Sequence, residues 1–426
     1  MAFPAVSLKQ FSKGSVGAMK FRFFSRSTFA LVLALCLSAG QSLFASTSAD
    51  TSNASVTAHP QTRSHLHHHA THIHHSTRAS VHTVIHRRHR RRMHHYYERF
   101  TASSYAQDQT VGDITGGEDP VVRQAAVDAL GDMNGTIVVI NPDNGRILTM
   151  VNRKLALSSG AEPCSTIKLS VALAALEEGI ITKDTPVYLG HNYRMTLTDA
   201  LAHSNNLYFE TVGRRLGFER VHYYATMFGL GELAGYNIPG EQLGVYPDHP
   251  LPESQGGVGR MCSFGESVSV TPLQLGALIA AIANGGTLYY LQHPQSQEEA
   301  AAFTPRIKRH LDIGPLLPSM SPGMADVVLF GTDRSVRANF KEFPVLGKTG
   351  TCSNHGTRFG WFGSYADTPH GRLVTVIFLE GGRPTYGPKA AELAGKFYRA
   401  LEDQNYFVTM NATQPQKDTE AVEANR

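Results

Sequence analysis

The stretch Ser165–Gly179, which reads STIKLSVALAALEEG, predicts a helix that is apolar on most of its sides. A helix of this composition is expected to be buried in the core of a domain. Residues three positions apart share one face of a helix, so the side chains of Ser165 and Lys168 can meet. Burial disfavours the charged form of a lysine, and a neutral lysine can activate a serine hydroxyl as a base. The stretch therefore indicates a serine nucleophile with a lysine base, at a helix start whose N–H groups can stabilise an oxyanion.

Two further short motifs follow in the chain, Ser204–Asn206 (SNN) and Lys348–Thr351 (KTGT). The Lys348–Thr351 motif, the third of the set, suits a strand that lines a cleft, because its glycine permits close approach of a substrate to the backbone. Lys348 adds positive charge near the serine–lysine pair. Each motif alone is weak evidence, but three in this order, one opening an apolar helix and one on a late strand, form a specific signal.

In this order the motifs resemble the S-x-x-K, S-x-N and K-T-G set of penicillin-binding proteins and serine β-lactamases. The likeness covers about residues 135–402 and is closest to the transpeptidase domain of class B penicillin-binding proteins. It extends to four other stretches: Ile140–Met150, Thr198–Gly229, Gly265–Gly286 and Trp361–Gly363. Two features differ from that family. A His/Arg-rich linker stands in place of the usual large N-terminal non-catalytic domain, and the short interval between the first two motifs predicts a trimmed helical subdomain.

The resemblance implies a role for each motif residue. Four residues are expected to take part in the chemistry, as nucleophile, base, proton relay and positive charge: Ser165, Lys168, Ser204 and Lys348. Four others are expected to bind the substrate: Asn206, Thr349, Gly350 and Thr351. Among these, the two threonine hydroxyls are assigned to the terminal carboxylate of the substrate. The backbone N–H groups of Ser165 and Thr351 are expected to form the oxyanion hole.

The implied activity is acyl transfer on the D-Ala-D-Ala end of peptidoglycan stem peptides, by transpeptidation or carboxypeptidation, with β-lactams as covalent ligands. A class D-like serine β-lactamase is the second interpretation, because Pro163–Lys168 and Trp361–Gly363 are compatible with it. Against it, the second motif ends in Asn206 rather than in an apolar residue. The third interpretation is a non-catalytic penicillin-binding sensor domain, which the complete set of catalytic side chains disfavours.

Strand signals lie at both ends of the catalytic region, which is expected to span residues 113–405. The expected elements are a helix at 120–130, a hairpin at 135–140 and 146–151, strands at 345–352, 359–365 and 373–379, and a last helix at about 389–401. The middle of the region, 180–340, is expected to be mostly helix and loop. This order predicts one α+β domain, an antiparallel sheet flanked by helices with a mostly helical subdomain.

The flanking segments differ in composition from the catalytic region. Residues 1–45 combine a basic start with an apolar run and are expected to be a signal peptide or a membrane anchor, which predicts export to the cell envelope. Residues 46–112 are rich in Ser, Thr, His and Arg and are expected to be a disordered linker. That linker is interpreted as a spacer, or as a segment that binds an anionic wall or membrane surface, or as a metal-capturing segment. Residues 406–426 are expected to be a disordered tail.

The charge distribution argues against a nucleic-acid partner. Residues 1–112 carry 13 of the 39 Lys and Arg residues but 3 of the 35 Asp and Glu residues, so the rest of the chain is net acidic. A nucleic-acid-binding domain needs a basic face on its folded part.

Of the four cysteines, Cys36 lies in the N-terminal apolar run, and the odd number of three that remains does not suit a disulfide framework. The cysteine spacings fit no zinc motif, and no metal or cofactor is expected. One bridge is possible in the catalytic region, and Cys262–Cys352 is the pair that we put forward. Cys164 and Cys352 border the motifs. They are interpreted as small core cysteines, with redox control of the cleft as the alternative. Four other residues beside the motifs have no assigned catalytic role. His203 and His355 are interpreted as cleft-rim residues. Glu162 and Glu266 are interpreted as solvated or structural carboxylates.

Overall fold

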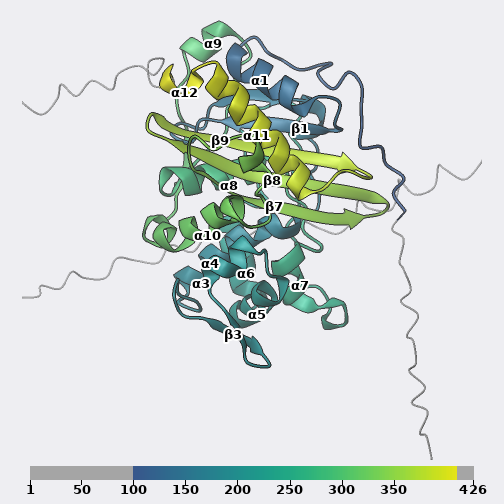
Figure 1. Ribbon diagram of the computed structural model, residues 1–426, viewed down its shortest axis with the longest axis vertical. Helices are drawn as coiled ribbons and strands as arrows, with labels where there is room; N and C mark the ends of the chain where they lie inside the picture. The colour runs from purple at the N-terminus through teal and green to yellow at the C-terminus, as the bar shows by residue number, and fades with distance from the viewer. Residues whose placement is uncertain (1–98, 410–426) are drawn as a thin grey trace, which may run out of the picture. The chain divides into compact units, whose positions relative to one another are not determined.

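A five-stranded antiparallel sheet organises residues 99–409, the part of the chain that the computed structural model describes (Figure 1). Its strand order is β2-β1-β9-β8-β7. The strands are β1 (Gly135–Ile140), β2 (Ile147–Val151), β7 (Val345–Asn354), β8 (Thr357–Thr368) and β9 (Gly371–Gly381). The early hairpin β1–β2 joins the three late strands through the β1–β9 pairing. The α+β fold class expected from the sequence is confirmed.

Helices cover both faces of this sheet, which explains why its strands read as continuous apolar runs rather than as an alternating pattern. Helices α1 (Pro120–Leu130) and α11 (Gly387–Asp403) cover one face, and α8 (Pro272–Asn284) covers the other. Alternate residues of β1 separate accordingly. Ile137 packs in the cluster that includes α1 and α11, whereas Val138 packs in the cluster that includes α8.

A helical subdomain lies next to the β7 edge of the sheet (Figure 1). It contains α3 (Lys168–Glu177), α4 (Leu197–Ala202), α5 (Asn206–Leu216), α6 (Phe218–Met227), α7 (Gly257–Phe264) and α10 (Leu317–Leu329). The predicted apolar helix is α3, and eight of its ten residues are buried. It begins three residues later than expected, because Cys164–Ile167 form a separate 3₁₀ turn, η1.

The remaining short elements connect these layers. The helices are α2 (Arg153–Ala156), α9 (Gln297–Ala301) and α12 (Tyr406–Thr409), with 3₁₀ turns η2 (Glu253–Gln255), η3 (Gly314–Leu316) and η4 (Val336–Ala338). Two small hairpins pair β3 (Val187–Gly190) with β4 (Tyr193–Met195) and β5 (Thr287–Tyr289) with β6 (Ile307–His310).

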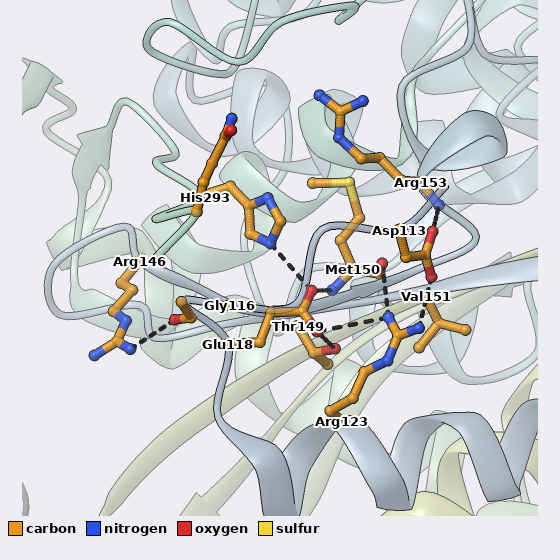
Figure 2. A network of polar contacts seen from close by, with 12 residues as sticks. Asp113, Gly116, Glu118, Arg123, Arg146, Thr149, Met150, Val151, Arg153 and His293 are labelled. Carbon is orange, nitrogen blue, oxygen red and sulfur yellow. Dashed lines mark hydrogen bonds and ion pairs between the residues drawn. The ribbon is translucent and has the colours of Figure 1, made fainter. Parts of the chain in front are cut away.

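A buried network of charged side chains covers the outer edge of β2 (Figure 2). The Glu118 carboxylate accepts hydrogen bonds from the Met150 N–H at 2.7 Å and from His293 Nε2 at 3.0 Å. Arg123 is paired with Asp113 at 2.7 Å. Because an edge strand exposes unpaired backbone groups, these contacts close an edge that would otherwise be open to another chain.

The expected end of the linker, at residue 112, and the expected start of the tail, at residue 406, both differ from the structure, in which the neighbouring residues are packed against the catalytic region. Residues 99–112 were assigned to the linker, but the Ser104 carbonyl accepts from the Asn134 N–H and the Ala106 N–H donates to the Asp132 carbonyl. The tail was expected to begin at Tyr406, yet Phe407 is fully buried and packs its ring against Phe340. These residues have too little apolar periodicity to be recognised from sequence, but they add to a core that other segments form.

Within residues 99–409, no helix is long and apolar enough to cross a bilayer. The expected leader (1–45), the greater part of the linker (46–98) and the end of the tail (410–426) lie outside the described residues.

Candidate active site

The nucleophile candidate Ser165 lies in η1, between the core of the helical subdomain and strand β7. The preceding residue, Cys164, has a φ of 52°, which turns the chain sharply into η1. The Thr166 hydroxyl donates to the Pro163 carbonyl at 2.7 Å and fixes this turn. Ser165 itself is partly exposed, whereas Thr166 and Ile167 are buried. The turn therefore presents one residue to the surface and anchors its neighbours.

Lys168 connects the first two motifs. Its Nζ lies 2.5 Å from Ser165 Oγ, 2.7 Å from Asn206 Oδ1 and 3.4 Å from Ser204 Oγ. The side chain is fully buried. The three polar contacts of a single lysine amine thus gather Ser165, Ser204 and Asn206 at one point. The approach of Lys168 to Ser165 is the one that their spacing predicted.

The surroundings of Lys168 favour its neutral form. Burial lowers the pKa of the Lys168 amine well below its usual value, and the nearby positive charge of Lys348 lowers it further. The carboxylate of Glu210 opposes these two effects. A neutral amine at 2.5 Å from a hydroxyl can accept the hydroxyl proton.

The second motif forms the turn between α4 and α5. Ser204 has a φ of 51°, so the chain reverses there. Asn205 is the N-cap of α5, and its side chain accepts a hydrogen bond from the Tyr208 N–H at 2.8 Å. The cap fixes the start of α5 and thereby places Asn206, the first residue of that helix, against Lys168.

The third motif lies on β7, the edge strand of the sheet. Lys348 is fully buried, and burial lowers its pKa to about 8, an effect that the Asp333 carboxylate opposes. Lys348 is therefore mostly protonated at pH 7. Gly350 faces the nucleophile turn: a Cβ atom on it would lie 2.7 Å from the Pro163 carbonyl oxygen and 3.3 Å from the Ser165 nitrogen.

The two threonines of this motif point to the other face of the sheet. The Thr349 hydroxyl donates to Asp333 Oδ1 at 2.5 Å and is buried, and the Thr351 hydroxyl accepts from the Gly387 N–H at 2.7 Å. Side chains alternate along a strand, so residues 349 and 351 must face away from the side that carries Lys348 and Gly350. The Thr349 hydroxyl, which is expected to bind a substrate carboxylate, thus donates to the Asp333 carboxylate in this structure. Thr351 is a partly exposed residue, and its hydroxyl can still donate its own proton.

Gly350→Ala is expected to lower the acylation rate of Ser165 by about 10- to 100-fold, because its Cβ would displace the backbone of the nucleophile turn. The measurement is the rate of labelling by a fluorescent penicillin. Gly363→Ala on the neighbouring strand is the matched control, because its Cβ would meet side-chain atoms of Leu275 and Ile279 at 3.2 Å, which can shift. Equal labelling rates for the two variants would contradict the role of this close contact.

A disulfide joins Cys164 to Cys352, with the Cα atoms 5.5 Å apart. The pairing Cys262–Cys352 that we put forward from the sequence is therefore wrong: Cys262 is a free, buried thiol in α7. Cys352 faces the same side of β7 as Gly350, and Cys164 precedes the nucleophile, so the bridge ties the nucleophile turn to β7. The sequence did contain a signal for the correct pairing, because Cys164 and Cys352 each lie directly beside a motif and the two motifs must meet in an active site.

The structure gives a separate setting to each of the other residues that stand beside the motifs in the sequence. Burial, followed by the charge of Glu266, raises the pKa of Glu162 to about 7, while Arg260 opposes that rise. Glu266 forms an ion pair with Arg260. Glu162 and His355 also line a cavity of about 510 Å³. His203 is exposed, with its ring 6.1 Å from that of Phe330.

Asp333 is the residue of this region that sequence reasoning missed. It is fully buried directly behind the third motif. It belongs to no recognised motif and lies on a connecting loop, so its sequence context carries no signal for its position.

Known proteins resemble this chain in sequence and in fold. The family model described as the penicillin binding protein transpeptidase domain matches residues 135–401. Stage V sporulation protein D of Bacillus subtilis is 29% identical over 318 residues, which cover 62% of this chain and 48% of that protein. The peptidoglycan D,D-transpeptidase MrdA of Acinetobacter baumannii is 25% identical over 354 residues, 64% of this chain and 51% of that protein.

Among solved structures, Pseudomonas aeruginosa PBP2 in complex with WCK 5153 matches with a TM-score of 0.54 and 22% identity, over 68% of this chain and 77% of that one. This likeness shows the fold. The chain belongs to the penicillin-binding protein transpeptidase family, as its motifs indicated. It spans about half the length of the two curated relatives described above.

Proposed function

We propose that the protein is a serine acyltransferase that acts on the D-Ala-D-Ala end of peptidoglycan stem peptides, as a D,D-transpeptidase, a D,D-carboxypeptidase or both. The observation that carries this proposal is the buried Lys168 amine in contact with Ser165 Oγ, Ser204 Oγ and Asn206 Oδ1. Membership in the transpeptidase family supports it.

In the proposed first step, Ser165 Oγ attacks the carbonyl carbon of the penultimate D-Ala while the neutral Lys168 amine takes the hydroxyl proton. The backbone N–H groups of Ser165 and Thr351 stabilise the oxyanion, and Lys348 contributes positive charge. When the peptide bond breaks, Ser204 passes a proton to the leaving amine, and D-Ala departs. The product is an ester between the stem peptide and Ser165.

The second step releases this ester. The amine of another stem peptide attacks it in transpeptidation, and water attacks it in carboxypeptidation, so that the proton returns to the serine oxygen. Asn206 is proposed to hold the substrate amide, and Gly350 to admit the substrate backbone beside β7. β-Lactams are proposed to acylate Ser165 in place of the peptide.

We also propose that the protein is exported and works in the cell envelope. The basic start and apolar run of residues 1–45 support this, as does the location of the proposed substrate. The part of the linker that precedes the packed residues (46–98) is proposed as a spacer that can also attach to an anionic surface, on the basis of its Ser, Thr, His and Arg content.

The proposed function is tested by labelling the purified protein with a fluorescent penicillin. We expect one covalent adduct on Ser165 that persists for many minutes, and no adduct on Ser165→Ala. D-Ala release from a pentapeptide then measures the peptide reaction. Rapid loss of the label would favour the β-lactamase interpretation, and the absence of any label on the wild type would favour the sensor interpretation.

A further inference from the structure

The loop Gly331–Asp333, between α10 and η4, contacts the segments that carry the second and the third motif. The Thr332 N–H donates to the carbonyl of Ala202 at 3.4 Å, just before the second motif. Its hydroxyl lies 3.2 Å from the hydroxyl of Thr349 in the third motif. A Cβ atom at Gly331 would lie 2.3 Å from the Ala202 carbonyl oxygen, so a glycine is needed for this approach.

The Asp333 carboxylate is fully buried at the end of this loop. Its Oδ1 atom accepts hydrogen bonds from the hydroxyl of Thr349 at 2.5 Å and of Thr332 at 2.8 Å. Its Oδ2 atom has no hydrogen-bond partner among the described residues. A buried carboxylate lowers the stability of the fold unless it is paired with a positive charge or all its oxygens accept hydrogen bonds. In Asp333 the Oδ2 atom accepts no hydrogen bond from the described residues.

The positive charge of Lys348 acts on this carboxylate without a direct ion pair between the two described side chains. Burial raises the pKa of Asp333, and the charge of Lys348 together with hydrogen bonds from Thr349 and Thr332 opposes that rise. In return, the Asp333 charge opposes the fall in the pKa of Lys348. The charged groups acting on this arrangement are Asp333 from the loop, Lys348 from β7, Lys168 from α3 and Glu210 from α5.

We propose that Asp333 is a positioning residue of the active site, whose buried carboxylate fixes Thr349 in β7 and supplies a negative charge behind the third motif, where Lys348 precedes Thr349. The proposal rests on the proposed acylation of Ser165, because Lys348 matters through its charge near the reacting groups. Asp333 lies behind the strand and acts through its two neighbours in the third motif.

The influence of the Asp333 charge on Lys348 determines how the pH profile of acylation should change when that charge is removed. When Asp333 loses its charge, the pKa of Lys348 falls below its value of about 8, so the Lys348 charge is lost at a lower pH. The alkaline limb of the acylation profile therefore moves to lower pH. The acid limb, which Lys168 sets, changes little because Lys348 is charged there in both proteins.

The test compares pH profiles of the acylation rate by fluorescent penicillin for the wild type, Asp333→Asn and the matched control Thr332→Val. The Asp333→Asn variant retains the side-chain oxygen that accepts from Thr349 but removes the charge. Thr332→Val removes a hydrogen bond but retains the charge. We expect the alkaline limb to move down by about one pH unit in Asp333→Asn, which corresponds to a roughly eightfold lower relative rate at pH 8.5, and to stay in place in Thr332→Val.

An unshifted alkaline limb in Asp333→Asn, with the rate lowered equally at every pH, would show a purely structural role and overturn the proposal. If Asp333→Asn gives little folded protein, Asp333→Ser is the second neutral variant and the same shift is expected. An NMR titration of ¹³C-labelled lysine side chains follows Lys348 without any turnover. It separates the two proposals: absence of acylation in the wild type defeats the proposed function, whereas an unchanged Lys348 titration defeats the role of Asp333.

Discussion

Lys168→Met is expected to lower the acylation rate of Ser165 by about 10³-fold. The substitution removes the base that lies 2.5 Å from Ser165 Oγ, and a positioned general base contributes on the order of 10²- to 10⁴-fold. The measurement is the second-order rate constant for labelling by a fluorescent penicillin. Lys183→Met, at an exposed position next to the same subdomain, is the matched control and is expected to react as the wild type does.

The thermal stability of Lys168→Met is expected not to fall with its acylation rate. The folded-state pKa of Lys168 is lowered, so at neutral pH the unfolded state binds more protons at this group than the folded state. The wild type therefore gains stability from this group as pH rises from its folded pKa toward the ordinary lysine value. The uncharged methionine side chain of the variant removes that cost, so we expect equal or greater thermal stability at pH 7 together with the loss of labelling. Retention of fast labelling would contradict the assignment of the base.

Loss of the Cys164–Cys352 disulfide is expected to reduce the free energy of unfolding by about 3–5 kcal/mol. The bridge closes a loop with a sequence separation of 188 residues, and long loops restrict the unfolded chain most. The measurement is chemical unfolding of the wild type with and without a reductant. Labelling of Ser165 is expected to slow as well, because the bridge holds the nucleophile turn against β7.

The double variant Cys164→Ser, Cys352→Ser provides the control for this experiment. It is expected to match the reduced wild type and to show no response to the reductant. Cys262→Ala is expected to retain the full response, since Cys262 is a free thiol. A response that disappears in Cys262→Ala would show that the pairing involves Cys262 after all.

The sequence predicted those features whose signals are local. The apolar helix, the 135–151 hairpin and the late strands each follow from composition and turn residues within a short window, and the structure contains all of them. The approach of Lys168 to Ser165 follows from helical spacing. The third motif could have been treated in the same way: strand alternation requires residues 348 and 350 to share one face, and thereby sends Thr349 to the other.

Features that depend on tertiary neighbours could not be predicted. The disulfide partner of Cys352 depends on which segment β7 contacts, and sequence spacing does not encode that choice. Asp333 is one carboxylate among many, and only its burial behind Thr349 distinguishes it. Phe407 lies in a short polar-flanked segment, and its burial depends on the aromatic residues around Phe340.

The pairing of β1 with β9 bears on how this protein attains its fold. Gly135 pairs with Leu379, so the centre of the sheet consists of strands from nearly opposite ends of the catalytic region. Such a topology has high contact order, and chains with many distant pairings fold slowly. During synthesis, β1 can hydrogen-bond with β2 but lacks its other neighbour until residues 371–381 have emerged. A chain interrupted before that point exposes the backbone of an apolar strand and is prone to aggregate.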